Sequence, residues 1–112
     1  METLYRGPSI SVVIPAYNRE KLILPTLQSV LNQRRQPIEV IVVDDASPDG
    51  TVEVVNAFAR ENPSLHLRCV VQSRNQGVSA ARNRGIREAS AEWVAFLDSY
   101  DLWEPNHLEL MV

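Results

Sequence analysis

Short apolar segments alternate with segments of helical spacing along the whole chain, and this alternation constrains the fold more than any other feature. The short segments are rich in β-branched or aromatic residues and cover residues 9–14, 38–43, 65–71 and 93–97. Two of them are almost continuously apolar, which is typical of strands covered on both faces. Apolar spacing predicts helices over residues 24–31, 51–61, 79–89 and from 105 onward.

This order of elements predicts one α/β domain built on a parallel sheet. Strand–helix–strand units have right-handed crossovers, which place helices on both faces of the sheet. The chain has 112 residues, which is the size of one ordinary domain. We expect residues 9–112 to form this domain and residues 1–8 to be an N-terminal tail. Ligands of such sheets bind beyond the carboxyl ends of the strands, so the loops after the strands are the candidate site.

Composition and charge exclude several classes of protein. The formal net charge is −3, whereas a protein that mainly binds nucleic acid carries a basic footprint. No apolar run approaches the roughly 18 to 20 residues of a transmembrane segment, and the first residues lack the pattern of a signal peptide. The single cysteine, Cys69, excludes an internal disulfide and a cysteine-rich zinc site. We therefore expect a cytoplasmic protein without nucleic-acid partners.

Carboxylates follow the second and the fourth predicted strands. Asp44 and Asp45 end the second strand, and Asp98 and Asp101 follow the fourth. Acids in such positions either cap backbone N–H groups of their own loops or accept hydrogen bonds from a bound base or sugar. Closely spaced acids also suit Mg²⁺ or Mn²⁺, which bind phosphates in turn. The pattern alone leaves these alternatives open.

The other loops carry groups that suit a nucleotide. Tyr17 follows the first strand, where its ring either stacks on a base or packs as a partly buried loop residue. Gly77 is free to take a positive φ before the third helix. Arg82 lies near the start of that helix, where N–H groups and basic side chains favour an anion, although a solvated arginine face is the alternative. The convergence of these loops is more informative than any one of them.

Four motifs resemble, in their order and spacing, those of family 2 glycosyltransferases, which are nucleotide-sugar enzymes of the GT-A fold. They are residues 10–18 (ISVVIPAYN), 42–47 (VVDDAS), 75–83 (NQGVSAARN) and 96–98 (FLD). The resemblance covers about residues 9–108. It implies a Rossmann-like nucleotide-binding half with a mainly parallel four-stranded sheet in the order 3-2-1-4 and helices on both faces.

The resemblance also implies which residues bind a nucleotide-diphospho-sugar donor, with a UDP-sugar favoured. Tyr17 would pack on the base, Asp44 or Asp45 would accept a hydrogen bond from the base or ribose, and Asp98 would address the sugar. The implied donor-binding residues are Pro15, Ala16, Tyr17, Asp44, Asp45, Gly77, Arg82, Asp98 and Ser99.

The loop after the fourth strand departs from the family pattern. Family members usually read Asp-x-Asp-Asp there, whereas this chain reads Asp-Ser-Tyr-Asp over residues 98–101. Tyr100 stands where a metal-contacting acid is expected, and a neutral phenol is a poor ligand for a hard cation. The resemblance implies a Mn²⁺ or Mg²⁺ ion that neutralises the diphosphate leaving group, and Asp98 and Asp101 are the ligands this sequence offers for it. A catalytically inactive nucleotide-binding remnant is therefore the alternative to a metal-assisted transferase.

Length is the second departure from the family pattern. Family domains generally continue past the fourth helix into a part that binds the acceptor and supplies the catalytic base. We expect that base beyond Val112, and we expect the fragment alone to be inactive. The acceptor, whether glycan, lipid or protein, is not indicated by the sequence.

The resemblance to enzymes of cell-envelope polysaccharide synthesis also implies where the protein is located. We expect it in the cytoplasm, and a peripheral position at the inner face of the membrane is the alternative. Its unfinished apolar edges predict self-association.

Two other classes of α/β domain fit the sequence less well. A receiver-like signalling domain carries its acidic pair after the first strand, and it needs a lysine near its last strands. Here the pair follows the second strand, and the only lysine is Lys21. A dinucleotide-binding domain needs a glycine-rich turn after the first strand, which this chain lacks.

Overall fold

The computed structural model describes residues 7–111. Its elements are β1 (Ile10–Ala16), α1 (Ile23–Leu31), β2 (Glu39–Asp44), α2 (Thr51–Glu61), the 3-10 turn η1 (Pro63–Leu65), β3 (Leu67–Val71), α3 (Val78–Glu88), β4 (Trp93–Phe96) and α4 (His107–Met111). The predicted alternation of strands and helices is confirmed, with ends displaced by one or two residues. Residues 1–6 of the predicted tail, and Val112, lie outside the described residues.

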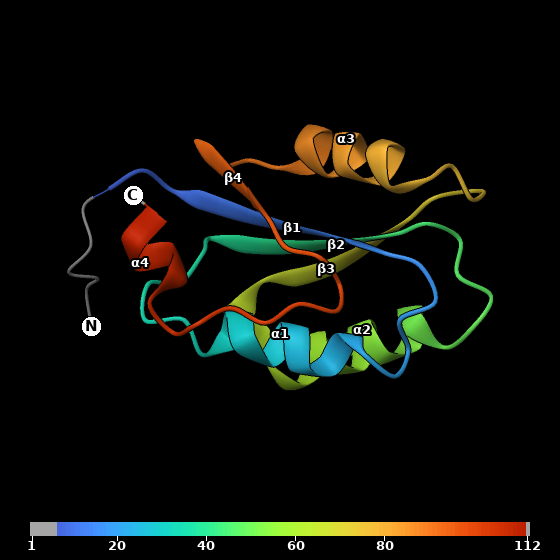
Figure 1. Ribbon diagram of the computed structural model, residues 1–112, viewed down its shortest axis with the longest axis horizontal. Coiled ribbons are helices and arrows are strands. Elements are labelled where there is room, and N and C mark those ends of the chain that lie inside the picture. The colour runs from blue at the N-terminus through green and yellow to red at the C-terminus, as the bar shows by residue number, and fades with distance from the viewer. Residues whose placement is uncertain (1–6, 112) are drawn as a thin grey trace.

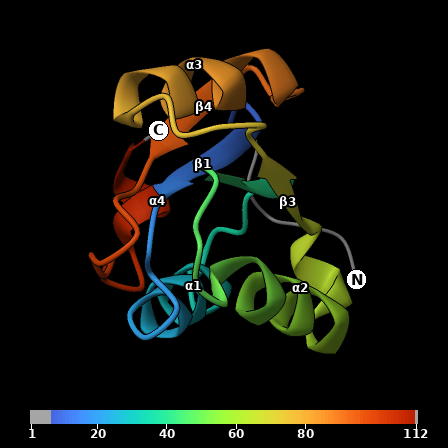
Figure 2. The ribbon, with the colours of Figure 1, turned by 90° about the vertical axis from the view of Figure 1, so that its right-hand side faces the viewer.

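The four strands form one parallel sheet in the order β3-β2-β1-β4. This confirms the expected order 3-2-1-4. Helices α1 and α2 cover one face of the sheet and α3 covers the other, as Figures 1 and 2 show from two directions. Strand β3 begins two residues later than predicted, because residues 63–65 form the turn η1 and His66 takes a positive φ of 52°.

Strand β1 is the centre of the core, and all seven of its residues are buried. Because side chains alternate across a strand, Val12 and Ile14 pack with the larger core cluster that includes α1 and α2. Val13 points the other way and joins a smaller cluster with Ile41 and Ala81. The central strand thereby fixes where its own carboxyl end, and the loop that follows it, emerge from the sheet.

Helix α3 lies close to the sheet because its inward face carries small residues. Ala81 and Gly85 are the buried residues of this helix. A Cβ atom added to Gly85 would stand 2.2 Å from Cγ1 of Val13. This close approach determines how far the first turns of α3 lie from the carboxyl end of β1.

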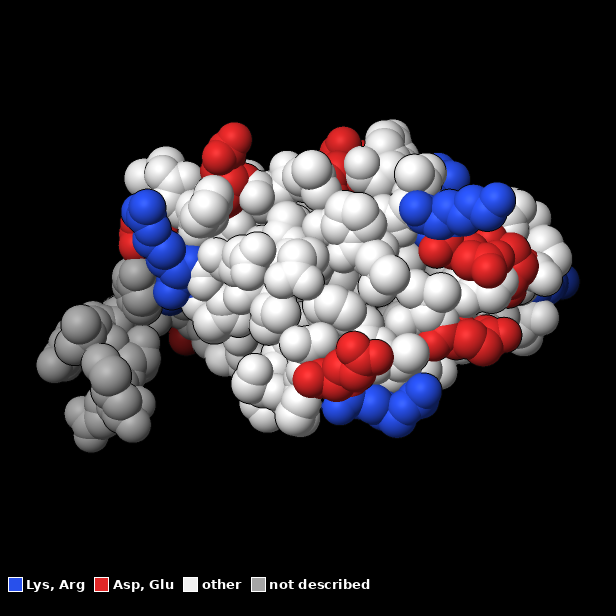
Figure 3. All heavy atoms as spheres, turned by 90° about the horizontal axis from the view of Figure 1, so that it is seen from below, with Lys and Arg blue, Asp and Glu red and all other residues white. Residues whose placement is uncertain are grey.

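The surface over α1 and α2 carries few charges in its middle, and the charged side chains gather at its borders (Figure 3). No helix within residues 7–111 has the length and apolar character needed to cross a membrane. Cys69 lies half-buried on β3, where burial raises the pKa of its thiol to about 12, with smaller contributions from Asp44 and Glu53. The thiol is therefore protonated at neutral pH, consistent with a packing role.

Candidate functional site

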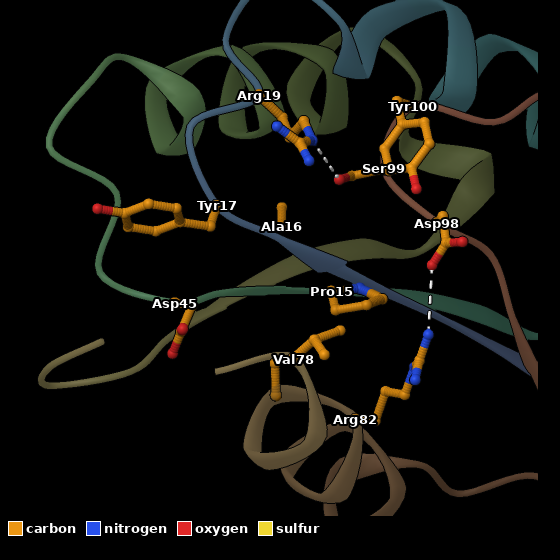
Figure 4. Close-up of a pocket in the computed structure, with 11 residues that line it drawn as sticks. Pro15, Ala16, Tyr17, Arg19, Asp45, Val78, Arg82, Asp98, Ser99 and Tyr100 are labelled. Carbon is orange, nitrogen blue, oxygen red and sulfur yellow. Dashed lines mark hydrogen bonds and ion pairs between the residues drawn. The ribbon is translucent and has the colours of Figure 1, made fainter. Parts of the chain in front are cut away.

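A pocket of about 340 Å³ opens at the carboxyl ends of β1, β2 and β4, beside the first turns of α3. Figure 4 shows how its walls are arranged: Arg19, Ser99 and Tyr100 come from one side of the β1 end, and Val78 and Arg82 come from the other. The lining residues are Pro15, Ala16, Tyr17, Arg19, Asp45, Val78, Ala81, Arg82, Asp98, Ser99 and Tyr100.

Seven of the predicted donor-binding residues line this one pocket, and two do not. The lining set holds Pro15, Ala16, Tyr17, Asp45, Arg82, Asp98 and Ser99. Asp44 is buried outside the lining set, and Gly77 and the candidate metal ligand Asp101 are exposed outside it. Loops that are distant in the sequence therefore meet at the place where a parallel sheet of this order binds ligands.

The carboxyl end of β1 contributes Pro15 and Ala16 to the pocket lining, and the exposed Tyr17 follows them. Asn18 takes a positive φ of 55°, a conformation that asparagine tolerates better than most residues, and it turns the chain away from the strand. Its backbone N–H donates to the Ser47 hydroxyl at 2.9 Å, which ties the β1 loop to the β2 loop. Tyr17 is 41% exposed, so one side of its ring is open to a ligand. Figure 4 shows Tyr17 and Asp45 on the side of the pocket away from Asp98.

Asp44 holds its own loop together. It is 1% exposed, and its two carboxylate oxygens accept hydrogen bonds from the Ser47 hydroxyl at 2.6 Å and the Ser47 backbone N–H at 2.9 Å. Of the two roles that the sequence left open for the acids, the structure gives Asp44 the local one. Of the two acids, Asp45 lines the pocket and Asp44 does not.

Asp45 joins the pocket wall to the loop before α3. Its carboxylate accepts the backbone N–H groups of Gln76 at 2.9 Å and Gly77 at 2.8 Å. Gly77 takes a φ of +96°, as predicted, and a side chain there would be strained although space is open around it. Gly77 directly precedes Val78, a lining residue that the sequence reasoning missed and that only its position after the glycine could have indicated.

Arg82 and Asp98 face each other across the pocket. The Arg82 Nη2 atom lies 3.4 Å from the Asp98 Oδ1 atom, and the two side chains are 42% and 39% exposed. A pair this exposed is worth little to stability, because water screens it and ordering two side chains opposes it. Both groups therefore remain able to exchange partners when a ligand enters.

Arg19 lines the pocket and was not among the site residues selected from the sequence. Its Nε atom donates to the Ser99 hydroxyl at 3.2 Å, and its guanidinium lies over the Tyr100 ring, 5.0 Å from the ring centroid. Ser99 is buried and Tyr100 is 57% exposed. The available signal was an arginine directly after the Pro-Ala-Tyr-Asn motif, but only the fold brings it to the loop after β4.

The residues of the site do not fit a divalent cation by themselves. Asp98 is paired with Arg82, Asp101 lies outside the pocket lining, and position 100 offers an uncharged phenol. Across residues 7–111, no group of three or more His, Cys, Asp or Glu side chains is placed to hold a metal ion. The acids that would supply oxygen ligands are engaged with an arginine or turned to solvent.

Comparison with protein families identifies a match over almost the whole chain. Residues 11–112 match the model of the glycosyl transferase family 2. The chain is 38% identical over 102 residues to TuaG of Bacillus subtilis (strain 168), whose name describes a teichuronic acid biosynthesis glycosyltransferase. That alignment covers 91% of this chain and 40% of TuaG, so the chain spans less than half the length of this relative.

Solved structures with this fold include two sugar-nucleotide complexes. The mannosyltransferase PcManGT of Pyrobaculum calidifontis, in complex with GDP-Man and Mn²⁺, has a TM-score of 0.86 and 36% identity. That match covers 94% of this chain and 31% of PcManGT. TarS of S. aureus, in complex with UDP-GlcNAc, has a TM-score of 0.83 and 34% identity over 92% of this chain and 30% of TarS. The sheet and its helices are thus the fold of known sugar-nucleotide enzymes.

Proposed function

Since the chain belongs to glycosyl transferase family 2, we propose that it binds a nucleotide-diphospho-sugar donor in the pocket at the β1, β2 and β4 ends and forms the donor side of a sugar transferase. One observation carries the proposal: seven residues selected from four separate segments of the chain, namely the β1 end, the β2 loop, helix α3 and the β4 loop, line one cavity. The cavity volume of about 340 Å³ lies within the range of small-molecule sites, roughly 300 to 1,000 Å³.

The two ends of the pocket suit the two ends of such a donor. Tyr17 and Asp45 offer a ring face and a carboxylate, which suit the base and the ribose hydroxyls. Arg82 and Asp98 lie on the other side (Figure 4) and suit the diphosphate and the hydroxyls of the sugar. The similar structures hold GDP-Man in one case and UDP-GlcNAc in another. We propose a UDP-sugar as the donor of this chain, and a comparison of bases tests that choice.

Calorimetric titration of UDP and GDP into the 112-residue chain tests donor binding. We expect UDP to bind, and we expect Tyr17→Ala to weaken binding by roughly fivefold to a hundredfold, which corresponds to the loss of one stacked base. Tyr17→Phe is the matched control, because it keeps the ring and removes only the hydroxyl. Absence of heat with both nucleotides, in the presence and absence of Mn²⁺, would contradict the proposal. Tighter binding of GDP would overturn the choice of base.

The transfer step needs a general base for the acceptor hydroxyl, and we propose that this base lies beyond Val112. The two carboxylates that line the pocket, Asp45 and Asp98, are proposed above to bind the donor, so neither is proposed as the base. We accordingly expect the 112-residue chain to release no UDP from a UDP-sugar above the buffer rate. Sustained release would show that a base lies within this chain.

The acceptor is proposed only by class. The name of TuaG refers to teichuronic acid biosynthesis, so a growing cell-envelope glycan is the acceptor we propose. The corresponding location is the cytoplasm, at or near the inner face of the membrane.

A further inference from the structure

The Arg19 guanidinium is an uncompensated positive charge in the wall of the pocket. Its Nε atom donates to Ser99, and Nη1 makes only a long contact of 3.5 Å to the Asn18 carbonyl oxygen. Within the part of the chain that the structure describes, Arg19 pairs with no carboxylate. An arginine held in a pocket without a counter-charge has donors left for an anion.

The orientation of Arg19 is fixed from two sides. The Ser99 hydroxyl accepts from Nε, and the Tyr100 ring lies under the guanidinium plane at 5.0 Å. Contacts of this kind hold a guanidinium flat and leave its outer edge to a ligand. Ser99 and Tyr100 therefore act as positioning residues for Arg19.

A second arginine, Arg82, and the N-terminus of α3 add positive charge to the same pocket. Arg82 lines the opposite wall, and its only carboxylate partner among the described residues is the exposed Asp98. Helix α3 has eleven residues, and no side chain caps its first turn. The N–H groups of that turn add partial positive charge. The pocket thus holds two guanidinium groups and a helix N-terminus beside two carboxylates, Asp45 and Asp98, and within residues 7–111 no group of three or more His, Cys, Asp or Glu side chains is placed to hold a metal ion.

We propose that Arg19, together with Arg82, binds and neutralises the diphosphate of the donor, so that this site binds a nucleoside diphosphate without a divalent cation. The inference rests on the proposed donor binding and concerns how the same pocket holds the phosphates. Tyr100 stands where the family pattern has an acid. An acid at this position would pair with Arg19 and cancel its charge, whereas the tyrosine ring positions Arg19 and leaves the charge in place.

Titration of UDP in EDTA and in Mn²⁺ tests the inference on the unmodified chain. We expect the two dissociation constants to agree within about threefold, and we expect affinity to fall as the salt concentration rises, since the contact is between charges. Arg19→Gln is expected to weaken UDP binding by roughly tenfold to a hundredfold, the range for a lost charge-assisted contact. Uridine, which has no phosphate, is expected to bind the variant and the wild type alike.

Three further variants separate the role of Arg19 from a general effect on charge or folding. Arg87→Gln removes the same charge from the exposed face of α3, outside this pocket, and should leave UDP binding unchanged. Arg19→Lys keeps the positive charge without the planar guanidinium and its paired N–H donors, and it should bind UDP more tightly than Arg19→Gln but less tightly than wild type. Tyr100→Asp, at an exposed position, should weaken UDP binding in EDTA and make it respond to Mn²⁺. Thermal melts establish that each variant is folded.

The outcomes distinguish this inference from the proposed function. Binding of UDP only in Mn²⁺ would overturn the inference and leave donor binding intact. Equal affinity of wild type and Arg19→Gln for UDP would also overturn it. Failure of both UDP and GDP to bind under all conditions would remove the proposed function, and the inference with it.

Discussion

The loop after β2 and the loop after β4 bring acids to the same edge of the sheet, but they are held in different ways. The β2 loop is fixed by the backbone: Asp44 binds Ser47, Asp45 binds Gln76 and Gly77, and Asp49 accepts the Thr51 hydroxyl and its N–H. In the β4 loop, the ion-pair and hydrogen-bond partners of the Asp98 and Ser99 side chains, among residues 7–111, are the two arginines of the pocket.

This difference divides the pocket into a preformed wall and an adjustable wall. Acids that accept backbone N–H groups stay in place whether or not a ligand is present, because the N–H groups would otherwise lose their partners. Side chains that meet exposed arginines can exchange partners with little loss of stability. We therefore expect substitutions in the β2 loop to reduce stability, and substitutions in the β4 loop to change ligand binding instead.

The largest effect is expected for Asp44→Ala. The buried carboxylate holds the Ser47 N–H and hydroxyl, and its removal should lower the free energy of unfolding by about 2 to 3 kcal/mol. Urea unfolding followed by circular dichroism measures the change. Asp101→Ala is the matched control in the other loop, where the carboxylate is exposed, and it should stay within about 0.5 kcal/mol of wild type. Equal losses for the two variants would contradict the division of the pocket.

Asp45→Ala is expected to have the next largest effect and to reduce both stability and binding. Two backbone N–H groups before α3 would lose their acceptor, which should lower the free energy of unfolding by about 1.5 to 2.5 kcal/mol. UDP affinity should fall as well, because Val78 and the α3 end would no longer be held. Asp45→Asn keeps an acceptor oxygen and should lose less of both. A variant with wild-type stability would show that the β2 loop is not preformed by this carboxylate.

The alternation of strands and helices was predictable from the apolar spacing of the sequence, and the strand order was implied by the resemblance to family 2 glycosyltransferases. Most of the residues that line the candidate pocket were predictable too, since Tyr17 and Asp45 directly follow strands, Asp98 follows β4 after one residue, and these strands end at one edge of the sheet. The roles of the acids were not predictable, because a strand pattern does not say which of Asp44 and Asp45 lines the pocket. Arg19 was missed because its contacts with Ser99 and Tyr100 join residues about 80 positions apart, and no local pattern encodes that meeting.

Asp49 provides a test of the β2 loop by pH. The hydrogen bond from the Thr51 hydroxyl, with others from backbone N–H groups, holds the pKa of Asp49 below its usual value. Because the folded-state pKa is lowered, the stabilisation is present above the unfolded-state pKa, near 3.8, and is lost as the pH falls through the folded-state value. Asp49→Ala should therefore lower the free energy of unfolding by about 1 kcal/mol at pH 7.

Urea unfolding at pH 7, 5 and 3.5 checks this expectation. The difference between wild type and Asp49→Ala should be the same at pH 7 and pH 5 and should begin to shrink at pH 3.5. Asp49→Asn, which keeps an acceptor oxygen without the titrating group, should show a difference from alanine that does not change with pH. A difference between wild type and alanine that grows toward low pH would contradict the assigned direction of the pKa shift.

The smallest effect on stability is expected for Ser99→Ala, although Ser99 is buried to 4% exposure. Among residues 7–111 its hydroxyl bonds only to the Arg19 Nε atom, and a water in the pocket can replace that contact, so the free energy of unfolding should change by about 0.5 kcal/mol or less. UDP affinity should nevertheless fall by roughly twofold to fivefold, because Arg19 loses one of its two positioning contacts. Ser73→Ala, at an exposed serine after β3, is the control for both measurements. If Ser99→Ala destabilised the fold as much as Asp45→Ala, the β4 loop would be as firmly built as the β2 loop, and the pocket would have two rigid walls.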